Sequence, residues 1–231
     1  PGPGPVGDET PSVTVVAPGG SHAIEAQGVR LWGIKLKNAT VSNSGALHLE
    51  RSVLQNSGAS CLRNEPGKTS TLVDVLIAGC YDGIDTLPGG QLNLDGVRIT
   101  DMKRHGVHAV ESKLVIRQLD VRDCDNAGLV GRGVQVDIDG MRTTANRIGI
   151  ELRDTDTGSL KSKGAVVNLI AHDNGEQGMV ITNSDIVVAF ATFYGNFSVG
   201  VANRVGLQLS CRGGSATIIN SITWKKATTP N

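Results

Sequence analysis

The feature that most constrains this chain is a pattern of about 22 residues that recurs between Gly79 and Val130. The apolar pattern h-x-h-x-x-h-x-h of Leu92–Ile99 returns 22 residues later (114−92) in Leu114–Val121. Three glycine-led pairs share the period: Gly83-Ile84, Gly106-Val107 and Gly128-Leu129. A period of about 20 to 50 residues is typical of solenoids, in which each unit buries its apolar face against its neighbours. The sequence therefore predicts one elongated body.

The same apolar pattern can be followed along the rest of the chain. Its copies start at residues 29, 47, 70, 92, 114, 136, 165, 186 and 217. Apolar residues alternate within each copy and then skip one position, which indicates two short strands meeting at a bend and not the 3.6 spacing of a helix. A third strand follows the glycine series, which continues as Gly149-Ile150, Gly178-Met179 and Gly200-Val201. We therefore expect a parallel β-helix of about nine coils, each with three short strands.

Turn-forming residues recur nine positions after most of these starts. They are Asn38, Asn56, Gly79, Asp101, Asp123, Asn174 and Gly195. Because Asn, Asp and Gly tolerate the left-handed backbone of a sharp corner, and stacked amides can hydrogen-bond along the axis, these residues predict a corner ladder. The low aromatic content of 3% and the 30 glycines fit a core of stacked aliphatic side chains.

On coil length, corner asparagines and the closing segment 218–224, the chain resembles the right-handed, pectate-lyase-like β-helix superfamily over residues 21–225. That resemblance implies an all-β, right-handed fold and a role with carbohydrate, because the superfamily includes polysaccharide lyases, glycoside hydrolases, phage tailspikes and surface adhesins. Fold alone does not choose among these activities. We expect a Pro/Gly-rich linker and N-terminal cap at 1–20, the β-helix at 21–225 and a tail at 226–231.

Composition limits the partners and the compartment. The 22 basic and 22 acidic residues balance, so no overall field would recruit nucleic acid. No run of about 18 apolar residues exists, so no transmembrane segment is expected. The Pro/Gly-rich start suggests a segment of a larger, exported chain, secreted or at the cell surface. The four cysteines do not form a framework typical of small secreted domains, and we interpret Cys61, Cys80, Cys124 and Cys211 as free buried thiols.

Chemistry-bearing side chains fall together on one lateral face if the coils stack in register. Two positions after the series glycines come Asp85, His108, Val130 and Glu151, with Arg63 one coil earlier. One or two positions before them come Tyr81, Asp82, Arg104, His105, Asn126 and Arg147. We predict Asp82, Asp85, Arg104 and His105 as candidate catalytic residues, because carboxylates and imidazoles one coil apart can perform general acid–base chemistry on a sugar. The alternative is a solvated ladder in which these side chains only pair across strands.

The segment 81–85 also looks like the Asn-Thr-Asp-Gly-x-Asp element of polygalacturonases. The likeness is partial. That family has an Asp-Asp pair in the next coil, where this chain has Arg104-His105-Gly106, and its later Gly-His-Gly and Arg-x-Lys elements are not evident.

Two coils are longer than the period, which predicts loops at 153–163 and 203–215. The first carries Asp154 and Asp156, spaced as in a calcium loop but without the third acidic residue and the distal Glu. No cofactor is expected; calcium is the one metal that the sequence suggests, with an exposed polar loop as the alternative. His172 and Phe193 occupy inward positions, whereas Tyr194 and Phe197 are candidate sugar-stacking rings, with packing as the alternative.

Three functions remain open. The first is a non-catalytic module that binds polysaccharide or a cell-surface partner through Arg63, Tyr81, His108, Arg147, Glu151 and Tyr194. The second is a polysaccharide lyase or glycoside hydrolase, and the third is a structural spacer or adhesin stalk. The first two differ on whether the two loops flank a cleft that contains Asp85 and His108.

Overall fold

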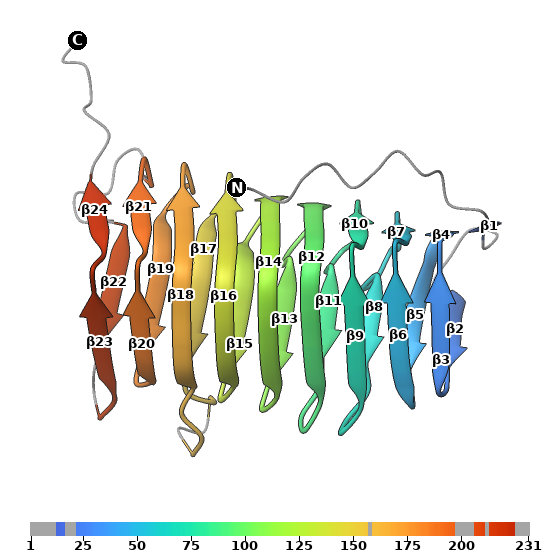
Figure 1. Ribbon diagram of the computed structural model, residues 1–231, viewed down its shortest axis with the longest axis horizontal. Coiled ribbons are helices and arrows are strands. Elements are labelled where there is room, and N and C mark those ends of the chain that lie inside the picture. Colours follow the sequence, from blue (N-terminus) through green and yellow to red (C-terminus); the bar gives the residue numbers. More distant parts are fainter. Residues whose placement is uncertain (1–12, 17–21, 157–158, 197–205, 211–212, 225–231) are drawn as a thin grey trace, which may run out of the picture.

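The computed structural model describes residues 13–16, 22–156, 159–196, 206–210 and 213–224. These residues form an elongated stack of parallel strands, with no helix among them (Figure 1). Neighbouring strands in each sheet come from successive coils of the chain, which is the arrangement of a parallel β-helix. The all-β prediction is confirmed, and no described segment is a helix long and apolar enough to cross a membrane.

The strands build three lateral faces. Face 3 is the nine-stranded sheet β2(His22–Ala26), β5(Ala39–Asn43), β8(Leu62–Asn64), β11(Ile84–Thr86), β13(Val107–Val110), β15(Ala127–Arg132), β17(Ile148–Arg153), β19(Gln177–Thr182) and β22(Leu207–Ser210). Face 1 opens with β3(Val29–Trp32), β6(Ala46–Glu50) and β9(Thr69–Val73), and face 2 with β1(Val13–Val16), β4(Ile34–Lys37), β7(Val53–Gln55) and β10(Leu76–Ala78). Four long strands then run through both faces: β12(Gln91–Met102), β14(Lys113–Cys124), β16(Gln135–Thr144) and β18(Lys163–His172). Face 1 ends with β20(Asp185–Ala189) and β23(Ser215–Ile219), and face 2 with β21(Thr192–Tyr194) and β24(Ile222–Trp224).

The predicted apolar pattern sets the register of these faces. Leu92 pairs with Leu114, and Leu114 with Val136, so that residues one period apart are neighbours along the axis. Alternate side chains point inward and form one continuous aliphatic core. The skipped position in the pattern is the bend between faces 1 and 2, where the backbone takes a positive φ, as at Gly96 (64°) and Gln118 (56°). A side chain that points into the core at one rung therefore stacks on the inward side chain of the next.

The predicted register is wrong in two coils after the insertion that follows Arg153. The structure pairs Gly164, not Ala165, with Val136, and the inward residues of β18 are then Val166, Leu169 and Ala171. Ile170 points outward and is exposed. A slip of one residue moves every side chain to the opposite face, and the sequence fits either register with apolar residues. The bend decides between them, because it falls on Asn168, with φ 54°.

The last coil shows the same one-residue shift. Ala216 pairs with Ile186, so the predicted inward residues Ile219 and Ile222 are exposed and the bend falls on Asn220. The described residues of this coil end at Trp224, and the number of complete coils that the structure describes is slightly smaller than the predicted nine.

Six of the seven predicted corner residues have a positive φ, between 55° and 68°: Asn38, Asn56, Gly79, Asp101, Asp123 and Gly195. The seventh, Asn174, is wrong by one position, since the left-handed residue is Asp173. Asn174 instead points inward in an amide ladder. Its Nδ2 donates to Asn196 Oδ1 at 2.8 Å, and Asn146 Nδ2 donates to Asn174 Oδ1 at 3.1 Å.

The glycine series stands at the start of face 3, where successive coils approach closely. A β-carbon at Gly106 would lie 2.5 Å from the carbonyl oxygen of Gly128, and one at Gly128 would lie 2.7 Å from that of Gly149. Only glycine leaves room for the next backbone. The predicted member Gly200-Val201 is outside the described residues, and its place in the pairing is taken by Gly206 and Leu207, which pairs with Met179.

The two predicted loops have different outcomes. β17 ends at Arg153 and β18 begins at Lys163, so the first insertion lies between face 3 and face 1. The predicted loop at 203–215 is wrong, because β22 (Leu207–Ser210) occupies part of it. Residues 197–205 and 211–212 of that region are outside the described part of the chain.

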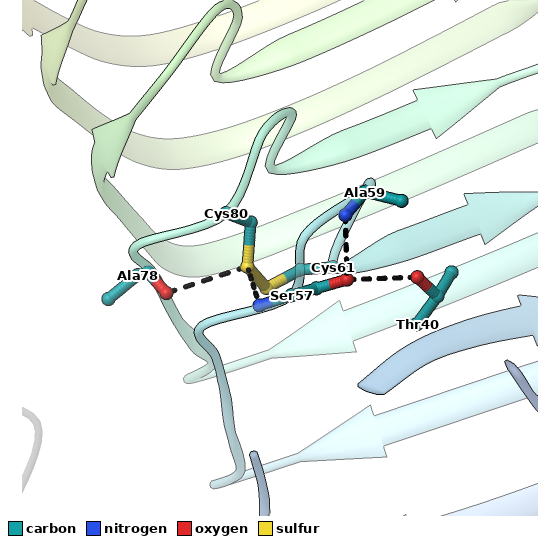
Figure 2. The surroundings of a disulfide bond; sticks show 6 residues. All are labelled: Thr40, Ser57, Ala59, Cys61, Ala78 and Cys80. Carbon is teal, nitrogen blue, oxygen red and sulfur yellow. Dashed lines mark hydrogen bonds between the residues drawn. A yellow bond between two sulfur atoms is a disulfide. The ribbon is translucent and has the colours of Figure 1, made fainter. Parts of the chain in front are cut away.

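The cysteine prediction is partly wrong. Cys61 and Cys80 form a disulfide between adjacent coils, with Ser57 N donating to Cys80 Sγ at 3.3 Å (Figure 2). Their separation of 19 residues is shorter than the period, because Cys80 lies at the corner of its coil and Cys61 just before face 3 of the coil below. Cys124 is a free buried thiol as predicted, and burial raises its pKa to about 12. Cys211 is outside the described residues.

We predict that Gly106→Ala destabilises the protein by more than about 2 kcal/mol, because the new methyl group would overlap a backbone carbonyl that cannot move without separating two coils. Gly58→Ala is the matched control, since a β-carbon there meets open space. Urea unfolding followed by circular dichroism measures both. Equal free energies of unfolding for the two variants would contradict the close approach of the glycines.

Candidate functional site

The predicted row of polar side chains lies on face 3, on adjacent strands. Asp85 pairs in register with Arg63 on one side and with His108 on the other. His108 pairs with Val130, and Val130 with Glu151. Val130 is buried, so it separates Glu151 from the row. The structure therefore brings together Arg63, Asp85 and His108, and places Glu151 two rungs farther along.

A second group precedes the glycines at the edge of the same face. Asp82 is buried, with 2% exposure, and accepts hydrogen bonds from Arg104 Nε at 2.9 Å and from the backbone N–H of His105 at 3.1 Å. Arg104 Nη2 also bonds to the other carboxylate oxygen. This ion pair raises the pKa of Arg104. Removing the guanidinium would leave an uncompensated buried carboxylate, which typically costs about 3 to 5 kcal/mol.

The contacts of Asp82 restrict its chemistry. Both of its oxygens accept hydrogen bonds from the bidentate guanidinium of Arg104, which leaves little room for a ligand to bond to them. Arg104 lies over the exposed ring of Tyr81, with its Cζ 5.0 Å from the ring centroid. Asp82 thus holds Arg104 and Tyr81 in place at the surface.

Asp85 and His108 form the more accessible pair. His108 Nδ1 lies 2.9 Å from Asp85 Oδ1, and both side chains are partly exposed. The His108 ring stacks on His105 with centroids 5.6 Å apart. A carboxylate paired with an imidazole on the next rung can exchange a proton with a bound hydroxyl group, or can simply hydrogen-bond to it.

His105 is held neutral. Its Nδ1 accepts a hydrogen bond from the backbone N–H of Ala127 at 3.4 Å. Burial lowers the pKa of His105 to about 4; Asp82 opposes this shift, and His108, Arg104 and Arg132 add to it. The ring therefore supports the site by packing and by accepting a hydrogen bond.

A third group surrounds the loop that follows β17. Glu151 lies 3.5 Å from Arg153, and Asp156 pairs with Arg132 at 3.0 Å and with Arg153 at 3.8 Å. Asp154 accepts a hydrogen bond from Asn183 at 3.2 Å. Over the described part of the chain, no group of three or more His, Cys, Asp or Glu side chains is placed to hold a metal ion. The arginines make Asp156 part of an ion-pair network.

The remaining candidates lie away from this row. Arg147 pairs with Glu176 at 3.0 Å at the corner between faces 2 and 3. Tyr194 is on β21 in face 2, where its ring stacks on His172 with centroids 4.7 Å apart, so it does not join the face 3 group. His172 is buried and hydrogen-bonded as expected, although it takes the outward register next to Ala171. Phe193 is in the core, and Phe197 is outside the described residues.

Sequence reasoning missed a groove at the corner between faces 3 and 1. It has a volume of about 520 Å³ and is lined by the turns that precede β12, β14 and β16 and by residues 159–161 and 163. Neither Asp85 nor His108 lines this groove. A signal for it was present in the sequence, because a long polar residue stands directly before three successive pattern starts, at Gln91, Lys113 and Gln135.

Comparison with known proteins gives a consistent picture of the fold. The family described as right-handed beta helix region matches residues 15–222. No curated protein matches the chain. Among solved structures, the enzymatically active domain of tailspike protein 2 of bacteriophage CBA120 is similar, with a TM-score of 0.52, 12% identity, and coverage of 87% of this chain and 38% of that one.

Two catalytic domains of GH87 α-1,3-glucanases are also similar. One, in complex with tetrasaccharides, has a TM-score of 0.52 and 10% identity, and the match covers 83% of this chain and 45% of that one. The other, from Streptomyces thermodiastaticus strain HF3-3, has a TM-score of 0.50 and 12% identity, with 89% and 50% covered. The chain thus spans half or less of the length of these structures, and the likeness at such identity shows the fold alone.

We predict that the melting temperature falls as the pH is lowered from about 6.5 to about 4, in part because of His105. Over this window the unfolded chain binds a proton at residue 105 and the folded protein does not, so acid favours unfolding; above it the contribution of His105 to stability is fully present. His105→Gln should show a shallower slope over this window in thermal unfolding followed by circular dichroism. Identical slopes for the two proteins would contradict the buried neutral imidazole.

Proposed function

Because the chain belongs to the right-handed β-helix family, we propose that its face 3 is a polysaccharide-binding surface of a secreted or cell-surface protein. The observation that carries the proposal is the register of Arg63, Asp85 and His108 on three successive strands, beside the exposed ring of Tyr81. A polysaccharide offers hydroxyl groups to such donors and acceptors, and its apolar ring faces can stack on an aromatic side chain.

The surface is rigid, which favours binding. Asp82 fixes Arg104, and Arg104 fixes Tyr81, so little side-chain entropy is lost when a ligand contacts the ring. The strands beneath are held by ladders of backbone hydrogen bonds on both sides. The disulfide Cys61–Cys80, which joins the two coils that carry Arg63 and Asp82, supports an oxidising compartment outside the cytosol. The two α-1,3-glucanase catalytic domains that share the fold support the proposal that the ligand is a polysaccharide.

We predict that Tyr81→Ala and Asp85→Ala each weaken binding about tenfold, because each removes one stacking or hydrogen-bonding contact. A panel of polysaccharides cast into native gels identifies a retarding ligand, and isothermal titration calorimetry then gives Kd for each variant. Asp137→Ala is the matched control, since Asp137 is an exposed carboxylate paired with Arg117 on face 1. If no polysaccharide retards the wild-type protein, or if the control weakens binding equally, face 3 is not the binding surface.

Hydrolysis or elimination at the same surface is the second candidate. It is favoured by the Asp85–His108 pair, because the Asp85 carboxylate bonds to an imidazole. The Asp82 carboxylate, in contrast, bonds to a bidentate guanidinium. In that case the wild-type protein releases new chain ends from a polysaccharide, and Asp85→Asn lowers the rate at least about a hundredfold. Asp137→Asn should keep the full rate. Equal rates for the wild type and Asp85→Asn would remove this candidate. If the wild type releases no chain ends, binding without catalysis is the function that remains.

A further inference from the structure

The groove at the corner between faces 3 and 1 is not part of the face 3 surface. Its floor contains corner glycines with positive φ, Gly89 at 75° and Gly133 at 62°. At one end the loop closes over Gly133, where a β-carbon would lie 2.7 Å from Thr155 Cγ2 and 3.1 Å from Leu160 Cβ. The absence of a side chain at these corners leaves the groove open along the helix axis.

Four long polar side chains line one wall of the groove in a column. Gln91 pairs in register with Lys113, Lys113 with Gln135, and Gln135 with Lys163. Successive rungs of a β-sheet are about 4.8 Å apart, so the column spans about 14 Å along the axis. This repeat is comparable with the length of one pyranose residue in an extended chain. The wall therefore offers one amide or ammonium group for each sugar residue.

The charge of the groove is positive. Three lysines and one acidic residue, Glu111, are among its lining side chains. Lys161 bonds to the carbonyl oxygen of Gly213 and lies 3.8 Å from Asp185. Lys113 and Lys163, two rungs apart, form no ion pair with any residue that the structure describes. Two ammonium groups in line thus remain available for negative charges on a ligand.

We propose that this groove binds a linear, negatively charged oligosaccharide along the helix axis, with one sugar residue per rung and its anionic groups on Lys113 and Lys163. Gln91 and Gln135 bond to its hydroxyl groups. The site is separate from the face 3 surface and does not rest on it, although both could bind parts of one polymer.

Calorimetry with short probes tests the proposal. A trimannuronate carries carboxylates, a carrageenan tetrasaccharide carries sulfates, and mannotriose is the neutral match for the first probe. We expect an anionic probe to bind the wild-type protein at least about tenfold more tightly than mannotriose, with an affinity that falls as salt is added. The carboxylate and sulfate probes together show which anion the groove accepts.

Two variants locate the site. The double variant Lys113→Gln/Lys163→Gln should weaken binding of the anionic probe at least tenfold. Lys103→Gln, an exposed lysine at the corner between faces 2 and 3, is the control and should leave Kd unchanged. The three lysines are exposed, so their replacement removes no core volume, and circular dichroism confirms that each variant folds.

Several outcomes would overturn the proposal. These are equal binding of mannotriose and trimannuronate, an unchanged Kd in the double lysine variant, and equally tight binding of a tetraglutamate peptide. If Tyr81→Ala abolishes binding of the anionic probe while the lysine variant does not, the ligand lies on face 3; the groove is then excluded and the proposed function stands.

Discussion

The whole structure depends on the close contact of backbone with backbone at the glycines that begin face 3. Each glycine, from Gly83 to Gly178, faces the carbonyl group of the glycine in the next coil at a distance that excludes a β-carbon. Parallel strands must stack about 4.8 Å apart to keep their hydrogen bonds. The turn that leads into each strand of face 3 must keep the same spacing from the turn of the next coil. Four residues within two positions of these glycines are therefore held in fixed positions relative to one another: Asp82, Asp85, His105 and His108.

That constraint explains why polar groups can gather on an otherwise apolar scaffold. The buried Asp82 carboxylate is tolerated because Arg104 and the backbone N–H of His105 replace its lost hydration. The same contacts place Arg104 over Tyr81 and bring His105 against His108. A short stretch of sequence thus produces a rigid surface, in which the buried Asp82 holds Arg104 in place and the outer pair Asp85–His108 supplies contacts for a ligand.

Much of the fold could be predicted because the repeat is a strong, long signal. The inward positions from Val29 to Val136, six corner residues and the adjacency of Asp85 with His108 all follow from counting along one period. Counting one period along the chain gives the wrong inward residues for β18. The insertion after Arg153 changes the register, and both registers of β18 present apolar residues to the core. Only the preference of Asn168 for a positive φ separates the two, and Gln118 and Phe190 at equivalent bends make that preference weak.

Other features could not be predicted from the repeat. The disulfide joins two residues that are 19 positions apart in the sequence, because Cys80 lies at a corner of its coil. The period predicts separations near 22 or 44 for residues in stacked coils. Tyr194 follows Phe193 in a regular strand, so it lies on face 2 and not in a loop. The groove depends on where the 154–162 loop folds back, and a loop conformation follows from tertiary contacts such as those of Leu160 with Gly133.

The most direct test of the account is the spacing of residues one and two periods apart. Asp95, Arg117 and Asp139 are register partners on three successive rungs of face 1. Cysteines substituted at 117 and 139 should oxidise to a disulfide, since neighbouring rungs are about 4.8 Å apart, whereas those at 95 and 139 are about 10 Å apart and exceed the limit of about 7 Å. Peptide mapping of the two oxidised double variants should therefore find the 117–139 bond and no 95–139 bond. The reverse result, or no bond in either, would contradict the stacking of coils on which every proposed site depends.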